Sequence, residues 1–192
     1  MKKRSLILIG LIFSNSLLFA GQNAYLKNDG QVFLTPNAKK EVGKIDTATP
    51  VEVLNEKGNF KKVKVSGWAA YGFENVLFKD VGKRIFYLVL DDNKTIKPQI
   101  LGEKTDTYDT VWKNVSYTFW VKKESLSKDI DSIYAKGKEL FTNRCGACHA
   151  APELEHYTVN QWPSIINSMK PRAGLTDEDM QFVVKFVQKH GK

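Results

Sequence analysis

Apolar and polar residues alternate with a period of two in the first part of the chain. The alternation is clearest at residues 51–54 and 61–65, and Lys57-Gly58-Asn59 forms a turn signal between these two segments. A period of two places successive side chains on opposite faces of a strand. Short alternating strands separated by Gly and Asn turns predict a small β-barrel.

More strands are predicted beyond this first group. Residues 85–90 form a continuous apolar run that ends at the turn signal Asp91-Asp92-Asn93, and residues 117–121 alternate again. We therefore expect a β extension over residues 79–127. The pattern leaves open whether these strands enlarge the barrel or form a second sheet.

The hydrophobic period changes to that of a helix after residue 128. Ile133, Gly137, Leu140 and Phe141 recur at i, i+4, i+7 and i+8, which places them on one helical face. Near the C-terminus, Thr176 is a candidate N-cap followed by three acidic residues, which the helix dipole favours there. The apolar face of this last helix consists of Met180, Val183, Val184 and Val187.

A middle helix is predicted between these two. Asn160 is a candidate N-cap, and Pro163 falls in the first turn, where its missing N–H costs nothing. Lys170-Pro171 is expected to stop this helix and to leave the Met169 sulfur near a loop. The apolar face has the spacing i, i+3, i+4 and i+7 and consists of Trp162, Ile165, Ile166 and Met169.

The N-terminus has the pattern of a secretory signal peptide. Three basic residues at 2–4 precede an apolar run over 6–13, and a short segment leads to Ala20, after which we expect cleavage. The run is shorter than the roughly 20 residues that a spanning helix needs, so no membrane span is expected after cleavage. An uncleaved anchor is the alternative. Export predicts a periplasmic protein.

The formal charge of +8 falls to +5 without the three basic residues of the signal peptide. Most of the remaining excess lies before residue 128, with the lysines scattered among the predicted strands. Export argues against a nucleic-acid partner, so we interpret these lysines as a solvated surface. Weak attraction of an acidic protein partner is compatible with this charge.

The chain has two cysteines, and both lie in Cys145-Gly146-Ala147-Cys148-His149. This CxxCH pattern is typical of covalent haem attachment. The thiols of Cys145 and Cys148 add to two vinyl groups of one porphyrin, and His149 ligates the iron. We therefore predict one covalently bound haem c. The alternatives are a thioredoxin-like pair, half of a zinc site and a structural disulfide. No βαβ pattern surrounds the pair, as a thioredoxin-like site would need, and no further ligands complete a zinc site. The five-residue motif is also more specific for haem than for a structural disulfide.

Met169 is the predicted second iron ligand. A soft thioether is a known haem ligand, and Met169 is the last residue of the apolar face of the middle helix. His156 is the second candidate, since ligation by two histidines is chemically sound. We interpret Met180 as a packing residue and His190 as a surface residue. An open site also stays possible from sequence. A distal His–Arg pair that would favour peroxide cleavage is not evident.

Two resemblances extend these patterns. Residues 22–78 resemble a bacterial SH3-like domain, on the basis of 43–45, 51–54, 58–65 and Gly67-Trp68. The helical part resembles class I cytochromes c, in which a small residue such as Gly137 allows the terminal helices to cross closely. More specifically, it resembles the C-terminal monohaem domain of the multihaem cytochrome that serves periplasmic trimethylamine N-oxide reductase. That resemblance rests on residues 137–141, the CxxCH motif, Asn160-Gln161-Trp162-Pro163 and Met169.

Together these features predict an α+β fold in two domains. A signal peptide over 1–20 would precede an SH3-like β-barrel over 21–78 and a β extension over 79–127. An all-α cytochrome c domain would follow over 128–192.

The predicted function is that of a periplasmic monohaem electron carrier and not of an enzyme. The resemblance implies a redox enzyme as partner, in the first place a molybdopterin N- or S-oxide reductase. A haem-based redox or gas sensor, or a scaffold, is the alternative, with the SH3-like module binding the partner.

Overall fold

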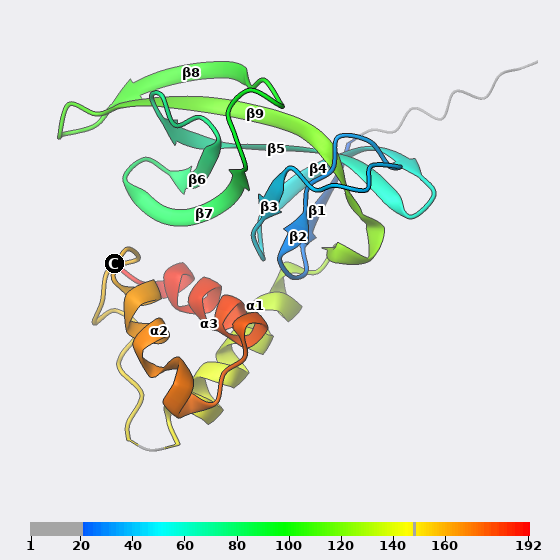
Figure 1. Cartoon of the computed structure of the whole chain (residues 1–192). Helices are drawn as coiled ribbons and strands as arrows, with labels where there is room; N and C mark the ends of the chain where they lie inside the picture. The colour runs from blue at the N-terminus through cyan, green and yellow to red at the C-terminus, as the bar shows by residue number, and fades with distance from the viewer. Residues whose placement is uncertain (1–20, 148) are drawn as a thin grey trace, which may run out of the picture.

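The structure is a computed structural model that describes residues 21–147 and 149–192. The predicted signal peptide and Cys148 therefore lie outside the described residues. In the described part, an antiparallel sheet lies on one side and three α-helices lie on the other (Figure 1). None of these helices is long and apolar enough to cross a membrane.

The sheet has ten strands, and its main path runs in the order β10-β1-β4-β5-β6-β7-β3-β2. β9 pairs with β5 away from this path, and β8 pairs with β9. The strands are β1 (Gln22–Leu26), β2 (Gly30–Gln31), β3 (Gly43–Ile45), β4 (Pro50–Lys57), β5 (Phe60–Ala70), β6 (Val76–Asp80), β7 (Lys83–Leu90), β8 (Gln99–Thr105), β9 (Val111–Lys122) and β10 (Leu126–Ser127).

β5 is the central strand of this sheet. It pairs with β9 along its whole length, from Phe60 opposite Lys122 to Ala70 opposite Trp112. Its other edge is shared by β4, which pairs with the first half of the strand, and by β6, which pairs at Trp68. The period-two prediction for this strand is confirmed, because Val63 and Val65 face the core with at most 1% of their surface exposed.

The predicted fold class is wrong. The strands on either side of residue 78 do not divide into a small SH3-like barrel and a β extension. β7 pairs with β3 and β6, and β9 pairs with β5, so that one curled sheet includes both groups. The pattern of single strands misses this arrangement because pairing between distant strands depends on the packed core and not on local periodicity.

The helical part begins directly after β10. A 3₁₀ turn (Lys123–Ser125) leads into β10, which pairs with β1, and α1 (Ile130–Leu140) follows. α1 continues into a π-helical turn, η2 (Phe141–Cys145). α2 (Trp162–Ala173) and α3 (Asp177–His190) complete the described helices. The predicted N-cap of α3 is confirmed, since the Thr176 hydroxyl accepts a hydrogen bond from the backbone N–H of Asp179.

α2 differs from its prediction at both ends. Asn160 is not its N-cap; that position belongs to Gln161, which makes no side-chain capping bond. The helix also continues past Pro171 to Ala173 and ends at Gly174, whose φ of 59° lies in the left-handed region. A proline in the last turn removes only one helical hydrogen bond, so a glycine C-cap three residues later sets the end.

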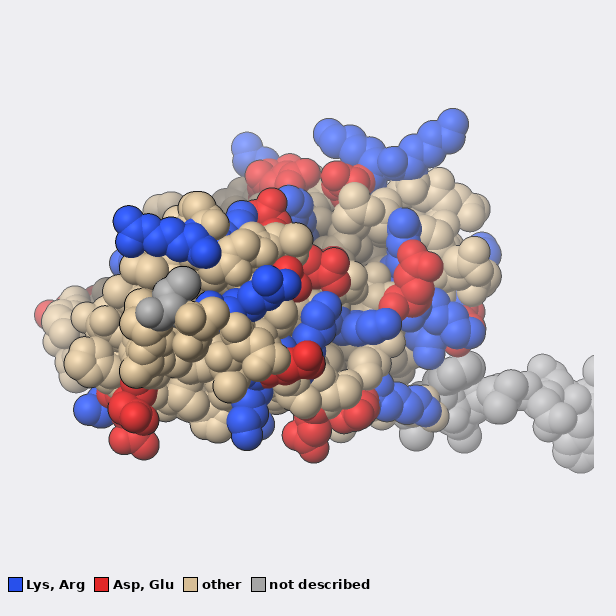
Figure 2. Space-filling model, turned by 90° about the horizontal axis from the view of Figure 1, so that it is seen from below, with Lys and Arg blue, Asp and Glu red and all other residues tan. Residues whose placement is uncertain are grey.

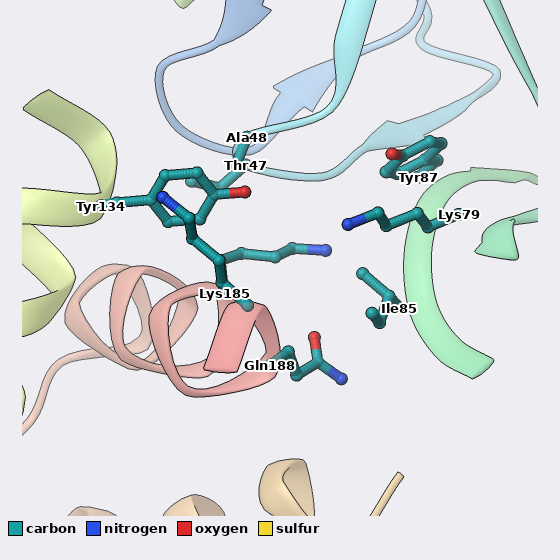
Figure 3. A pocket seen from close by; sticks show the side chains of 9 residues that line it. Thr47, Ala48, Lys79, Ile85, Tyr87, Tyr134, Lys185 and Gln188 are labelled. Carbon is teal, nitrogen blue, oxygen red and sulfur yellow. The ribbon is translucent and has the colours of Figure 1, made fainter. Parts of the chain in front are cut away.

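The helices pack on the sheet through both apolar and polar contacts. Ala48, in the loop before β4, forms a buried cluster with Ile133 of α1 and Phe182 of α3. Lys185 extends from α3 toward the sheet (Figure 3). Its ammonium lies 3.0 Å from Asp46 Oδ2 and donates to the Phe86 carbonyl at 2.6 Å. The sheet and the helices are therefore in contact through buried residues of both layers.

Candidate haem-binding cavity

A cavity of about 360 Å³ opens in the helical part. Cys145 from the π turn, His149 from the following loop and Met169 from α2 all contribute to its walls. Apolar and aromatic side chains make up most of the remaining wall. The largest of these are Phe141, Tyr157, Trp162, Ile165 and Ile166.

Cys145 is the last residue of the π turn and is half-buried. A π-helical turn widens the helix locally and is frequent at functional sites. Here it turns the thiol toward the cavity at the end of α1. Burial raises the pKa of the Cys145 thiol, so the neutral thiol is favoured. Cys148, the other predicted haem attachment residue, lies outside the described residues.

His149 is exposed and lies in the loop after the π turn, where its side chain lines the cavity. Its Nδ1 lies 2.9 Å from the Ala150 carbonyl oxygen. In the tautomer that donates this hydrogen bond, Nε2 carries the free lone pair. A backbone acceptor of this kind fixes the ring orientation and raises the basicity of a ligating imidazole. The geometry therefore suits iron ligation through Nε2.

Met169 lies in the third turn of α2 and is half-buried. It does not lie at the helix end, as the sequence suggested, but its side chain still lines the cavity. The same face presents Trp162, which is fully buried and donates from Nε1 to the Leu154 carbonyl at 3.1 Å. The Trp162 ring also meets Tyr157 edge-on, with ring centroids 5.0 Å apart. These contacts hold the α2 face that forms the wall.

The other candidate iron ligands lie elsewhere among the described residues. His156 is exposed and its ring packs edge-on against Tyr157, but His156 itself does not line the cavity. Met180 packs against the helical core, and the His190 ring lies 5.1 Å from the Phe186 ring near the end of α3. The structure thus brings Met169, but none of these three, to the wall that includes Cys145 and His149.

Two arginines at the cavity were not singled out from the sequence. Arg144 precedes Cys145 directly, and Arg172 lies in the last turn of α2. Both are exposed at the cavity's edge. Guanidinium groups pair well with carboxylates, so these positions suit the acidic edge of a porphyrin. Arg172 was missed because α2 was expected to stop before it.

The residues present fit a haem. Ligand pockets typically measure roughly 300–1,000 Å³ and are mostly apolar with a few polar groups, and this cavity has those properties. A thiol, an imidazole and a thioether are the groups that attach and ligate haem in c-type cytochromes. The donor set of Cys145, His149 and Met169 therefore matches this cofactor.

Comparison with known proteins places the chain among c-type cytochromes. It is 29% identical to the cytochrome c-type protein TorY of Haemophilus influenzae over 100% of the chain and 50% of that protein. It is 28% identical to the cytochrome c-type protein TorC of Escherichia coli K12 over 88% of the chain and 44% of that protein. The chain thus spans about half the length of the curated relatives it matches. No solved structure matches it significantly.

Residues 19–126 match the model of the TorC third cytochrome c domain, and the chain belongs to this family. Membership in a cytochrome c family implies haem c as the cofactor. The matched residues correspond to the sheet, whereas both cysteines follow them in the chain. The part that matches a cytochrome c domain is therefore made of strands, which corrects the expectation of an all-α domain.

Proposed function

We propose that this protein is an electron-transfer cytochrome with one haem c. Cys145 and Cys148 would hold the haem covalently, and His149 and Met169 would ligate its iron. The observation that supports this assignment is that Cys145, His149 and Met169 come from three different segments and line the same cavity. When bound, the haem supplies an iron that alternates between the ferric and ferrous states.

The residues of the chain would make this exchange easy in two ways. His149 and Met169 would together fill the iron's ligand positions, which would leave no position for a substrate. Thioether ligation also raises the potential relative to ligation by two histidines. The buried side chains of Phe141, Trp162 and Ile166 exclude water from the cavity wall, and a dry environment is a further means of tuning the potential.

We propose the periplasm as the location, because the pattern of residues 1–20 is that of a secretory signal peptide. In bacteria, thioether attachment takes place outside the cytoplasm, which agrees with export. The proposed partner is a redox enzyme of the molybdopterin N- or S-oxide reductase class. Support comes from the resemblance of the helical part to the cytochrome that serves trimethylamine N-oxide reductase.

The surface around the helices suits a brief contact with such a partner. Figure 2 shows a broad area without charged side chains on this face, with basic and acidic side chains spread around it. Redox partners usually meet through small interfaces, typically below ~1,200 Å². A neutral patch bordered by charges of both signs allows contact and fast release.

The test is to express the full chain in a bacterium with an active haem-attachment system. Haem that stays bound after denaturation, at one per chain, is the expected result. The ferric spectrum is expected to show the sulfur-to-iron charge-transfer band. Met169→Leu keeps the side-chain volume and is expected to abolish this band, whereas His156→Ala is the matched control and is expected to retain it.

A chain without covalent haem would refute the proposed function. A haem-loaded chain that binds carbon monoxide rapidly in the ferrous state would instead support the sensor alternative, because that reaction needs an open or weakly held position. Slow binding is expected from the proposed ligand pair.

A further inference from the structure

Asn160 connects the start of α2 to the sheet. Its Nδ2 donates to the Gly82 carbonyl at 2.9 Å, and its Oδ1 accepts from the Arg84 N–H at 2.6 Å. Gly82 lies in the β6–β7 turn with φ of 71°, a conformation that favours glycine. The Asn160 side chain therefore binds one backbone carbonyl and one backbone N–H at this turn.

The same part of β7 is also held from α3. Gln188 is buried, and its Nε2 donates to the carbonyls of Arg84 and Val159 at 3.1 and 3.0 Å. Figure 3 shows Gln188 and Lys185 on α3, facing the strand that carries Ile85. The backbone of Arg84 thus has its N–H bound by Asn160 and its carbonyl bound by Gln188. The turn is therefore held from both α3 and the segment before α2.

Asn160 links this support to the helix that forms one wall of the cavity. Asn160 precedes Trp162, the first residue of α2 and a fully buried part of the cavity wall, by two positions. The N-cap residue Gln161 makes no side-chain capping bond; its side chain accepts from Thr158, and Asn160 adds two bonds that tie this helix end to the sheet. Met169 follows Trp162 by seven residues, or about 10 Å along a rigid helix. A shift at the start of α2 therefore displaces Met169.

We propose that Asn160 is a positioning residue for the haem. It ties the start of α2 to the β6–β7 turn, so that the helix holds Met169 at the cavity wall, where its thioether would ligate the iron. The sheet thereby controls the strength of the thioether ligand, although none of its strands lines the cavity. This inference rests on the proposed function, in which Met169 ligates the iron.

The test compares haem-loaded, full-length variants. Asn160→Ala removes both bonds to the turn, and Asn167→Ala makes the same change at an exposed position within α2. Covalent haem content is expected to be unchanged in both. In Asn160→Ala the charge-transfer band is expected to weaken, the reduction potential to fall, and carbon monoxide to bind the ferrous protein about tenfold faster, equivalent to about 1.4 kcal/mol. Asn167→Ala is expected to match the wild type.

Asn160→Asp serves if Asn160→Ala does not fold. It keeps the acceptor for the Arg84 N–H but loses the donor to the Gly82 carbonyl, so an intermediate effect on band and binding rate is expected. The thermal midpoint is recorded for each variant. A lower midpoint with an unchanged band and binding rate would mean a purely structural role and would overturn the inference.

The remaining outcomes separate the two proposals. Wild-type protein without covalent haem overturns the proposed function and this inference together, before any variant is made. Wild-type protein with haem but without the charge-transfer band overturns the inference and the role of Met169, and leaves haem attachment standing. If the wild type shows the charge-transfer band and a folded Asn160→Ala variant has the same band, potential and binding rate, the inference alone is overturned.

Discussion

Asp29, in the loop between β1 and β2, accepts two hydrogen bonds from a single residue. Its Oδ1 accepts from the Thr47 N–H at 2.8 Å and from the Thr47 hydroxyl at 2.9 Å. Thr47 is fully buried, so these donors need an acceptor. Burial raises the pKa of the Asp29 carboxyl group above its ordinary value, and the negative charge of Asp46 raises it further. The carboxyl group thus accepts the hydrogen bonds of the two buried Thr47 donors, but its negative charge is unfavourable at this position.

We expect Asp29→Asn to change how stability depends on pH. The amide oxygen can accept the same bonds without a charge. The folded state binds the Asp29 proton more tightly than the unfolded chain does. Protonation of Asp29 therefore stabilises the fold fully below the ordinary pKa of 3.8, and this stabilisation is lost as pH rises through the raised pKa. The free energy of unfolding of the wild type, relative to the variant, should fall over this window in urea titrations.

The matched control for this prediction is Asp106→Asn. The indole N–H of Trp112 donates to Asp106 and lowers the pKa of its carboxyl group. The stability of the wild type relative to this variant should therefore rise as pH rises from the lowered pKa toward 3.8 and stay constant above it, which is the opposite direction. Equal slopes for the two variants would contradict the assignment.

At the scale of the elements, α1 and α3 cross in close contact at Gly137. A Cβ atom there would lie 2.3 Å from the Phe182 carbonyl oxygen and 2.7 Å from Phe186 Cβ. The backbone of α1 thus rests directly on α3, as the resemblance to class I cytochromes c implied. This close approach brings Phe141 and Phe186 together, with ring centroids 5.9 Å apart, next to the cavity.

Gly137→Ala is expected to destabilise the protein even though alanine favours helices by about 1 kcal/mol. Forcing a methyl group against backbone atoms costs roughly 1–3 kcal/mol, and the helices must separate to accept it. Chemical denaturation would measure the loss. Gly102→Ala is the control, since nothing lies within 4 Å of that position and a surface change stays within about 0.5 kcal/mol. A Gly137→Ala protein more stable than the wild type would refute the close crossing.

At the scale of the whole molecule, the sheet and the helices stabilise each other through a polar contact as well as apolar packing. The side chain of Lys185 is 8% exposed and that of Asp46 is 26% exposed, and the two lie 3.0 Å apart between the layers. Thr47 and Tyr134 border the same region (Figure 3). The ammonium also satisfies the Phe86 carbonyl, so its removal leaves two acceptors without their donor.

Lys185→Met is expected to lower the free energy of unfolding by about 2 kcal/mol. Breaking a fully buried pair costs about 3–5 kcal/mol, and water that still reaches Asp46 reduces this loss. Lys138→Met, at an exposed position of α1, is the control and should change stability little. Comparable losses in both variants, measured by urea unfolding, would show that the pair does not hold the layers together.

Local patterns predicted the parts of the molecule that depend on neighbours in sequence. The alternation at Val63 and Val65 identified a strand with one buried face, and Thr176 identified the start of α3. The apolar spacing from Trp162 to Met169 identified the cavity-lining face of α2. The CxxCH motif remains a prediction of haem attachment. Periodicity and capping are short-range effects, which explains why a single sequence reveals them.

Long-range contacts decided the rest. The pairing of β5 with β9 joins segments about fifty residues apart in one curled sheet, where local turns suggested a small barrel. Asn160 had the right residue type for an N-cap, yet its side chain bonds to the β6–β7 turn. A strand or an amide can choose among several partners, and only the packed core determines which of them is within reach. The sequence therefore specifies the chemical groups of the candidate site, and the tertiary structure brings them to one cavity.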